Sequence, residues 1–424
     1  MAAVEAATSA DMPAHEESLS ARYRRVRAVT TALCEPLEPE DLVVQSMPDA
    51  SPAKWHLAHT SWFFEQFLLK PYLKAYQPFR TEYEFLFNSY YESVGPMYTR
   101  ADRGLLTRPT VSEVLAYREH VDSHMAELLE RRAEDDRIAS IATLGMNHEQ
   151  QHQELLLTDL KHLFSRNPLL PAYGTLALES FGEAAPMRLL PFEGGVKEVG
   201  ATGKHFCFDN ETPRHRVLIE PFALADRLIV NSEYREFIRE GGYRRAEFWL
   251  SDGWAMVKRE SWTRPLYWSE AMDAQFTLAG LQPLQPNAPV THLSYYEADA
   301  FARWTGMRLA TESEWEIAAS HLPVRGNLLD SSRLHPAPAE SSASLKQMFG
   351  DAWEWTSSSY NAYPGYRAAA GALGEYNGKF MCNQFVLRGG SCVTPSEHIR
   401  ATYRNFFYPH ARWQFTGLRL AKDF

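Results

Sequence analysis

The first 165 residues carry apolar side chains at the three- and four-residue spacing that is typical of amphipathic helices. This spacing predicts four helices, at residues 16–34, 53–75, 111–132 and 138–165. Before the third of them, Thr110 and Glu113 have the spacing of a capping box, in which each side chain binds a free backbone N–H at the helix N-terminus. Four successive helices favour an up-and-down bundle.

A long connection separates the second and third predicted helices. It runs from Pro78 to Thr107 and contains two adjacent tyrosines, Tyr90 and Tyr91. Connections of this length are uncommon in a compact domain, and they are often functional. The loop is therefore a candidate part of a site.

The pattern changes between residues 166 and 187, where prolines and small residues interrupt the helical spacing. We place a linker at residues 171–187, between a helical domain at residues 15–170 and a second domain at residues 188–424. In the second domain, short apolar runs alternate with glycines and aromatic residues.

The second domain mixes strand and helix patterns. Residues 217–230 are typical of a strand, a turn and a strand, whereas residues 231–243 and 294–320 are typical of short helices, the second capped by Ser294. The C-terminal segment is typical of strands broken by glycines. The sequence therefore predicts an α+β fold of two domains, the first a four-helix bundle.

Length and charge narrow the classes of function. The chain has 424 residues, which suggests two or three domains. Its 43 Lys and Arg side chains against 53 Asp and Glu side chains give a net charge of −10. Nucleic acid is not the expected partner, because a polyanion would on average be repelled.

The cysteines and the N-terminus bear on the compartment. Cys34, Cys207, Cys382 and Cys392 are widely spaced and form no CxxC motif, which excludes a disulfide-dense secreted scaffold and a zinc ribbon. The N-terminal residues lack the basic and apolar regions of a signal peptide, and no apolar run reaches the length of a membrane span. We expect a cytoplasmic protein with no membrane partner.

Two pairs of histidines lie on predicted helices. His148 and His152 are four residues apart in NHEQQHQE, so they share one helix face and can chelate one divalent metal. His56 and His59 lie on an earlier helix, and in an antiparallel bundle one of them can face the first pair. Three neutral imidazoles would leave coordination positions open for substrate and oxygen.

Other interpretations of these residues exist. The segment HEQQH matches the HExxH pattern of zinc proteases, in which the glutamate, here Glu149, is the general base. The extended pattern fails, because Leu155 and Thr158 occupy its glycine and histidine positions. A downstream residue such as Glu179 could act as the third ligand, so a metal-dependent hydrolase is a weaker alternative. A ligand-binding module without catalysis is a third.

The motifs together resemble a known family. HLAHTSWFFE followed by NHEQQHQE resembles the DinB-type metal-binding bundle. In the second half, GDAWEWTSS, VLRGGS and TGLRLAKD resemble the formylglycine-generating enzymes (sulfatase-modifying factors), whose fold is a variant of the C-type-lectin fold. The combination resembles the iron-dependent sulfoxide synthases of ergothioneine biosynthesis, from about Ala21 to the C-terminus.

This resemblance implies a non-haem Fe(II) enzyme that uses O2. It would join a thiol, cysteine or γ-glutamylcysteine, to C2 of the imidazole of hercynine (Nα-trimethylhistidine) and give a sulfoxide. The implied iron ligands are His59, His148 and His152. His56 matches the helix but no ligand position, and we interpret it as a hydrogen-bonded or surface histidine.

The resemblance also implies substrate contacts. Gln151 and Asn405 match residues that bind hercynine, and Phe406 can supply an aromatic wall for its quaternary ammonium group. Phe407 stands where relatives carry an aspartate that helps to bind γ-glutamylcysteine. Its identity favours cysteine as the sulfur donor.

Two arginines complete the implied pocket. Arg100 and Arg103, in YTRADRG, match residues that hold the carboxylates of the thiol, and two arginines in one loop suit anion capture.

One catalytic position differs from the family. Relatives carry a tyrosine four residues before the arginine of RGG, which is Arg388 here, but this chain has Gln384. An amide cannot serve as an acid, so we hypothesise that Tyr90 or Tyr91 donates a proton or hydrogen atom during oxygen reduction.

Near relatives stay open as alternatives. A histidine-directed sulfoxide synthase and a selenium-transferring homologue share the motifs. Formylglycine generation is not expected, because Cys392 and His398 stand where that reaction needs paired cysteines. Structural calcium is possible, although no loop indicates its site. The sequence leaves the thiol donor, the oligomeric state and the native metal open.

Overall fold

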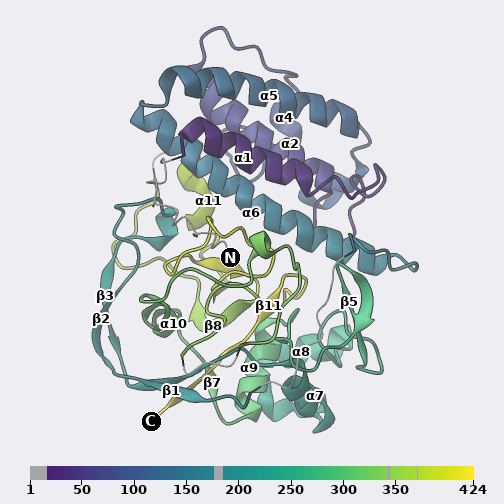
Figure 1. Cartoon of the computed structure of the whole chain (residues 1–424), viewed down its shortest axis with the longest axis vertical. Coiled ribbons are helices and arrows are strands. Elements are labelled where there is room, and N and C mark those ends of the chain that lie inside the picture. The colour runs from purple at the N-terminus through teal and green to yellow at the C-terminus, as the bar shows by residue number, and fades with distance from the viewer. Residues whose placement is uncertain (1–16, 176–184, 341–343, 370) are drawn as a thin grey trace, which may run out of the picture.

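The computed structural model describes residues 17–175, 185–340, 344–369 and 371–424. The chain forms a helical half and a mixed half, which lie one above the other in Figure 1. This is the α+β architecture that the sequence predicts. In the described ranges, none of the helices combines the length and the apolar character that a membrane span needs.

Four long helices build the helical half: α1 (Leu19–Ala32), α2 (Ala53–Phe64), α5 (Val111–Arg132) and α6 (Asp136–Arg166). The second helix continues through a π-helical turn (Glu65–Leu69) into α3 (Lys70–Tyr72). The four predicted helices are therefore present, with bounds that differ by at most three residues. The predicted capping box is present as well: Thr110 Oγ1 accepts from the N–H of Glu113, and Glu113 accepts from the N–H of Thr110.

The long loop between α2 and α5 contains only a short helix α4 (Tyr83–Leu86) and a 3-10 turn (Arg100–Leu105). Helix α2 packs against both α5 and α6. Gly145 allows the close approach of α6, because a Cβ atom at that position would lie 2.5 Å from the ring of Phe64 and 2.8 Å from that of Phe63. A larger side chain would push apart the two helices that carry the histidines.

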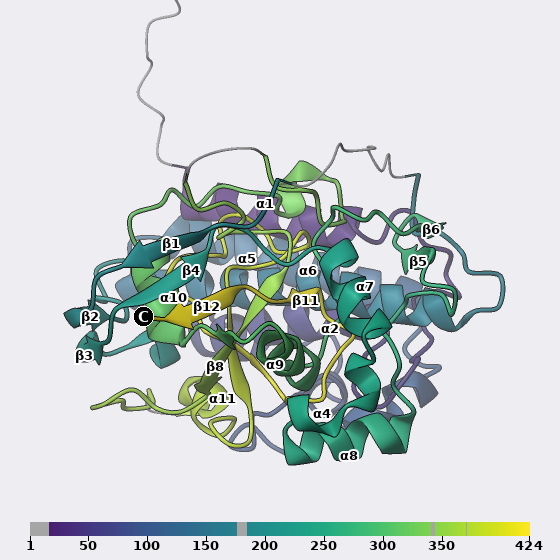
Figure 2. The ribbon, with the colours of Figure 1, turned by 90° about the horizontal axis from the view of Figure 1, so that it is seen from below.

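The mixed half contains two four-stranded sheets. The first has the order β1 (Leu189–Phe192), β4 (Phe222–Ala225), β12 (Leu420–Asp423), β7 (Arg308–Leu309). The second has the order β10 (Asn405–Phe407), β9 (Phe385–Arg388), β8 (Trp353–Ser359), β11 (Thr416–Gly417). Figure 2 views the molecule from the side away from the bundle and shows β1, β4 and β12 side by side.

In the described residues, two hairpins and five α-helices complete this half. The hairpins are β2 (Gly195–Val199) with β3 (His215–Ile219) and β5 (Ala274–Thr277) with β6 (Gly280–Pro283). The helices are α7 (Asn231–Arg239), α8 (Ser251–Glu260), α9 (Tyr295–Trp304), α10 (Glu312–Ala319) and the short α11 (Glu375–Gly378).

The predicted helical segment 294–320 is in part wrong. It contains two helices, α9 and α10, with strand β7 between them. Ser294 caps α9 as predicted, but Thr311 begins a second capping box for α10. Helix α8 and the β5–β6 hairpin were not predicted. The strand, turn and strand at 217–230 correspond to β3 and β4, although these strands belong to different sheets.

Helix α6 is the bundle helix that lies against the mixed half (Figure 1). A buried apolar cluster crosses the boundary and joins Leu156, Leu157 and Leu160 of α6 to Phe276 and Phe415 of the mixed half. The core is therefore continuous between the halves, and α6 is buried from both sides.

Candidate metal centre and substrate pocket

Three buried histidines converge between α2 and α6. The Nε2 atom of His148 lies 3.3 Å from Nε2 of His59 and 3.1 Å from Nε2 of His152. The structure therefore brings together the three residues that the resemblance implies as ligands. In the described part of the chain they are the only group of three or more His, Cys, Asp or Glu side chains placed to hold an ion, so structural calcium stays a prediction.

The protonation of the three rings fits a metal. Burial lowers the pKa of His148 to about 4 and holds the pKa values of His59 and His152 well below their usual range. His59 donates its Nδ1–H to the carbonyl oxygen of Phe87 at 2.6 Å. In the neutral ring, Nε2 then carries no proton and has a free lone pair. Lone pairs that face one another repel unless a cation lies between them. The donor set suits iron, zinc, copper and nickel alike.

Aromatic rings fix the position of His59. Trp55 stacks on it with ring centroids 4.5 Å apart and an angle of 14°, and Trp62 stacks on it at 5.6 Å and 15°. The guanidinium carbon of Arg103 lies 3.3 Å from the centroid of Trp55. The stack therefore links a candidate ligand to a candidate substrate-binding residue.

Glu149 does not face the candidate ligands. Its carboxylate accepts from Arg118 at 2.5 Å, from Arg27 at 3.0 Å and from Thr30 at 2.6 Å. Burial acts to raise its pKa, but Arg118 and Arg27 lower it to about 2. A general base at the metal therefore has no support here, and the HExxH interpretation is wrong for this glutamate. Glu179, the suggested third ligand, lies outside the described residues.

A cavity of about 190 Å³ adjoins the three histidines and lies between the two halves of the molecule. Its walls include every candidate site residue: His59, Tyr90, Tyr91, Arg100, Arg103, His148, Gln151, His152, Asn405, Phe406 and Phe407. A wider cavity of about 690 Å³ reaches His148, Gln151 and Tyr91 as well. Residues from both halves of the molecule thus line the same cavity.

The two loop arginines form no ion pair with any described residue. Arg103 donates to the hydroxyls of Ser51 at 2.9 Å and Ser89 at 3.0 Å, and Arg100 donates to the hydroxyl of Tyr90 at 2.8 Å. The Nε atoms of both arginines are buried and have no hydrogen-bond partner among the described residues. Burial, followed by the charge of Arg100, lowers the pKa of Arg103 to about 9. Two desolvated cations at a cavity wall have the charge and the hydrogen-bond donors that suit a carboxylate.

The adjacent tyrosines have different surroundings. Tyr90 packs edge-to-face against Phe380, with ring centroids 4.9 Å apart, and its hydroxyl accepts from Arg100. Tyr91 is buried beside Trp62, at a centroid distance of 5.6 Å, and burial raises the pKa of its phenol. Both line the cavity next to the histidines.

The mixed half supplies the opposite wall. Gln151 of α6 donates to the hydroxyl of Tyr403 at 2.8 Å. Asn405 accepts the N–H of Phe406 at 2.9 Å. Phe406 stacks on Tyr360 with centroids 4.1 Å apart, so part of its surface is already covered. Phe407 lines the cavity near Trp413.

Several lining residues were missed by sequence reasoning: Ser51, Trp55, Asp159, Tyr376, Phe380, Trp413 and Gln414. Trp55 could have been found, because it lies four residues before His59 on the same helix face. Gln414 is buried, and neither polar atom of its amide has a partner among the described residues. It comes from an irregular segment, where no periodicity marks it.

Two of the sequence motifs that carry the family resemblance, NHEQQHQE and RGGS, contact each other across the two halves. Glu154, at the end of NHEQQHQE, accepts from Trp353 at 2.5 Å, from Ser391 at 2.9 Å and from Thr394 at 2.7 Å. Ser391 is the serine of RGGS. Because one carboxylate of α6 takes three hydrogen bonds from the mixed half, the wall of the cavity is fixed against the helix that carries His148 and His152.

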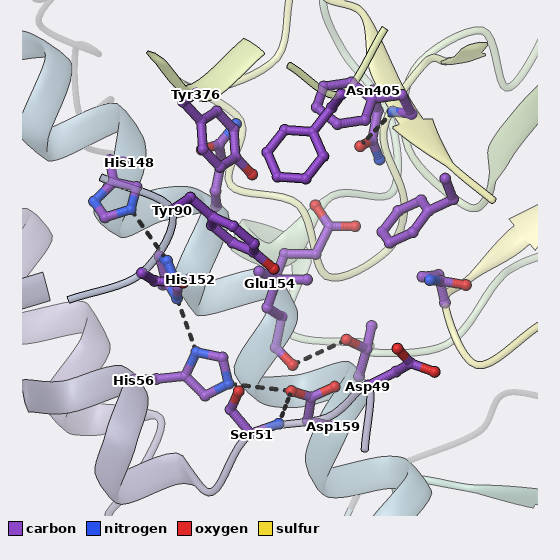
Figure 3. Close-up of a pocket in the computed structure, with 18 of the residues that line it drawn as sticks. Asp49, Ser51, His56, Tyr90, His148, His152, Glu154, Asp159, Tyr376 and Asn405 are labelled. Carbon is purple, nitrogen blue, oxygen red and sulfur yellow. Dashed lines mark hydrogen bonds and ion pairs between the residues drawn. The ribbon is translucent and has the colours of Figure 1, made fainter. Parts of the chain in front are cut away.

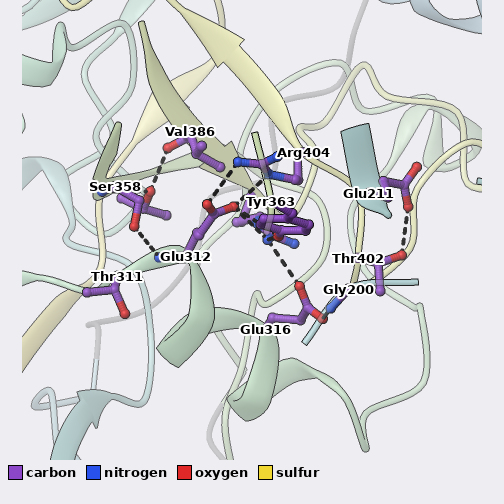
Figure 4. Close-up of polar contacts among 12 residues, drawn as sticks. Gly200, Glu211, Thr311, Glu312, Glu316, Ser358, Tyr363, Val386, Thr402 and Arg404 are labelled. Atoms are coloured by element: carbon purple, nitrogen blue, oxygen red, sulfur yellow. Dashed lines mark hydrogen bonds and ion pairs between the residues drawn. The ribbon is translucent and has the colours of Figure 1, made fainter. Parts of the chain in front are cut away.

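Arg388, the arginine of RGG, is part of a buried network rather than of the pocket. It forms ion pairs with Glu312 at 2.9 Å and Glu316 at 3.1 Å. Arg404, which lines the cavity, binds the same Glu312 at 2.8 Å (Figure 4). The network therefore fixes strands β9 and β10, which carry the motif and Asn405.

The helical half and the mixed half match two different families of known proteins. Residues 22–156 match the DinB superfamily, and residues 183–337 and 330–424 match the sulfatase-modifying factor enzyme 1-like domain. The chain is 30% identical to "Hercynine oxygenase" of Mycobacterium tuberculosis and 32% identical to that of Mycolicibacterium smegmatis, over 96% of this chain and 99% of each relative. It is 28% identical to "Ergothioneine biosynthesis protein 1" of Schizosaccharomyces pombe, over 52% of this chain and 28% of that protein.

Proposed function

Because the chain belongs to the family of the hercynine oxygenases, we propose that it oxidises hercynine with O2 in ergothioneine biosynthesis, forming a C–S bond from imidazole C2 to a thiol and giving a sulfoxide. The observation that carries the proposal is the convergence of three neutral histidines at a cavity with two arginines that form no ion pair with any described residue.

His59, His148 and His152 would hold Fe(II) through their Nε2 atoms. Bound there, Fe(II) would supply electrons to O2 and a coordination site for a thiolate. The histidines occupy one side of the site, where α2 and α6 meet, so the open side faces the cavity. The buried tryptophans Trp55 and Trp62 exclude water from the ligand rings.

Arg100 and Arg103 would bind the carboxylate of the thiol substrate. Their side chains lie on one wall, and Arg103 is held in place by Ser51, Ser89 and the face of Trp55. Phe407 has no charge that could bind the amino group of the γ-glutamyl part of γ-glutamylcysteine. Free cysteine is therefore our preferred sulfur donor.

Hercynine would lie against the wall from the mixed half. Gln151 and Asn405 have amides that can bind its imidazole and carboxylate. Tyr376, Phe380 and Phe406 form an aromatic group whose faces suit a quaternary ammonium, with Phe380 and Phe406 centroids 5.9 Å apart.

One of the two adjacent tyrosines would donate a proton or hydrogen atom to the reduced oxygen. Tyr90 has a hydroxyl already oriented by Arg100, whereas burial keeps the phenol of Tyr91 protonated. Each lies at the cavity, and Gln384 does not provide an acid at the alternative position.

The test is oxygen uptake by Fe(II)-loaded protein with hercynine and either cysteine or γ-glutamylcysteine, with products identified by mass spectrometry. We expect a sulfoxide-linked adduct with cysteine and none when His148→Ala replaces the wild type. Uptake only with a selenium donor would support the selenium-transferring alternative. No uptake with protein that holds one iron would refute the proposal.

A further inference from the structure

A second row of polar side chains lies behind the three histidines. His56 is on α2, one turn before His59, and Asp159 is on α6, two turns after His152. Both are buried, with 2% and 6% of their surface exposed. Buried polar side chains are costly unless they are hydrogen-bonded, so their partners indicate their role.

These residues form a continuous chain that begins at His152 (Figure 3). The Nδ1 atom of His152 lies 2.8 Å from Nδ1 of His56. The Nε2 atom of His56 lies 3.1 Å from Oδ2 of Asp159. The same oxygen accepts the backbone N–H of Ser51 at 2.8 Å, which anchors the far end of the chain.

One arrangement of protons satisfies the whole chain when both rings are neutral. A carboxylate only accepts, so His56 donates to Asp159 from Nε2. Its Nδ1 is then a lone pair, and His152 must donate to it from Nδ1. The Nε2 atom of His152 is left without a proton, and it is this atom that lies 3.1 Å from Nε2 of His148.

We propose that His56 and Asp159 are positioning residues that fix the tautomer and ring orientation of His152 for metal binding. Asp159 also makes His152 a stronger electron donor, because its negative charge acts through the hydrogen bonds of His56. The inference rests on the proposed metal centre of three histidines. It implies that these three ligands are not equivalent.

The three candidate ligands differ in what holds them. His59 donates to the backbone carbonyl of Phe87, and Nδ1 of His148 has no hydrogen-bond partner among the described residues. Of the three, His152 alone is joined to a carboxylate in the described part of the chain. Loss of the hydrogen bonds that join His152, His56 and Asp159 should therefore weaken one ligand and leave the other two in place.

The test measures the affinity of the metal-free full chain for Co(II) and Fe(II), by anaerobic competition with a chelator. His56→Phe removes the acceptor of the His152 proton, and we expect metal binding about 10- to 100-fold weaker. Asp159→Asn keeps the shape but removes the charge, so its loss should be smaller. The matched control is His162→Phe on α6, which loses a comparable hydrogen bond to Ser46, 2.7 Å long, and should bind as the wild type does.

A second measurement follows the proton itself. In the Co(II)-loaded protein, the Nδ1 proton of His152 gives a shifted proton resonance that should exchange slowly in wild type and rapidly in His56→Phe. Equal affinities and a retained slow proton in His56→Phe would overturn the proposal. If His56→Phe fails to fold, unchanged affinity in Asp159→Asn overturns it. A wild type that binds neither ion, or His148→Ala that binds normally, would instead overturn the metal centre and this proposal with it.

Discussion

Replacement of Glu149 by glutamine should destabilise the bundle strongly while the chemistry of the metal centre stays nearly intact. Glu149 lies beside His148 in the sequence, within a pattern that elsewhere marks a catalytic base. In the structure its carboxylate instead neutralises two buried guanidinium groups, those of Arg27 and Arg118. The two roles predict opposite results for one substitution.

The magnitude follows from the partners that remain. Arg27 keeps an ion pair with Asp122 at 2.6 Å, but Arg118 forms no ion pair with any described residue other than Glu149. Removal of one partner from a buried ion pair costs about 3–5 kcal/mol, because the other charge stays buried without compensation. The two halves share one core, and for an unfolding unit of 424 residues such a loss lowers the melting temperature by roughly 5 °C.

The assay combines thermal unfolding with turnover for each bound metal ion. Glu149→Gln should melt about 5 °C lower and turn over within a few-fold of wild type, whereas loss of a general base would cost roughly 10²- to 10⁴-fold in rate. The exposed Glu130→Gln is the surface control. The double variant Glu149→Leu with Arg118→Leu should recover part of the stability, because no unpaired charge stays buried. A normal melting temperature with lost turnover in Glu149→Gln would refute this reasoning.

Four further predictions follow from other parts of the site and its surroundings. Burial lowers the pKa of Lys161 to about 7 from 10.5, so the unfolded chain binds more protons between these values and wild-type stability rises with pH in that range. Relative to Lys161→Met, wild type should therefore gain about 2 kcal/mol of stability between pH 7 and pH 9, as measured by melts at both values. Arg103→Gln should raise KM for the thiol about 10-fold or more and leave KM for hercynine nearly unchanged, because it removes the charge that we propose binds the carboxylate of the thiol. Tyr90→Phe or Tyr91→Phe should reduce sulfoxide formation about 10-fold or more, and full activity in both would contradict the donor role. Removal of the metal by a chelator should lower the melting temperature, because saturation at 100 times Kd contributes about 2.7 kcal/mol; an unchanged melt would exclude binding at the native site.

The helical half could be predicted because its signals are local. Apolar spacing defined the four helices, and the spacing of His148 and His152 placed them on one face. The orientation of Glu149 had no comparable local signal. The spacing HExxH places its glutamate at the metal in zinc proteases, whereas here Arg27 and Arg118, which are distant in sequence, bind the carboxylate.

The mixed half was harder because its signals are not local. Trp413 and Gln414 reach the cavity from an irregular segment, and Tyr376 comes from the short helix α11. No period in the sequence marks such positions, since their placement depends on contacts with distant strands. The boundary between α9 and α10 was missed for a related reason, because strand β7 has only two residues and pairs with β12.

Helix α6 takes part in three structures at once: the candidate metal centre, the bundle and the contact with the second half. One face carries His148 and His152 toward α2, and Gly145 on the same face permits the close approach. A second face carries Glu149 and Gln153, whose side chains bind partners on α1.

The third face of α6 is directed to the mixed half. Asn147 lies 3.2 Å from His398, Gln151 binds Tyr403, and Glu154 binds the serine of RGGS. Their spacing of four and three residues is that of a single helix face. Buried polar side chains on a helix are costly unless they are hydrogen-bonded. The partners on the third face belong to the second half, so we infer that α6, which carries His148 and His152, folds as one unit with the pocket wall.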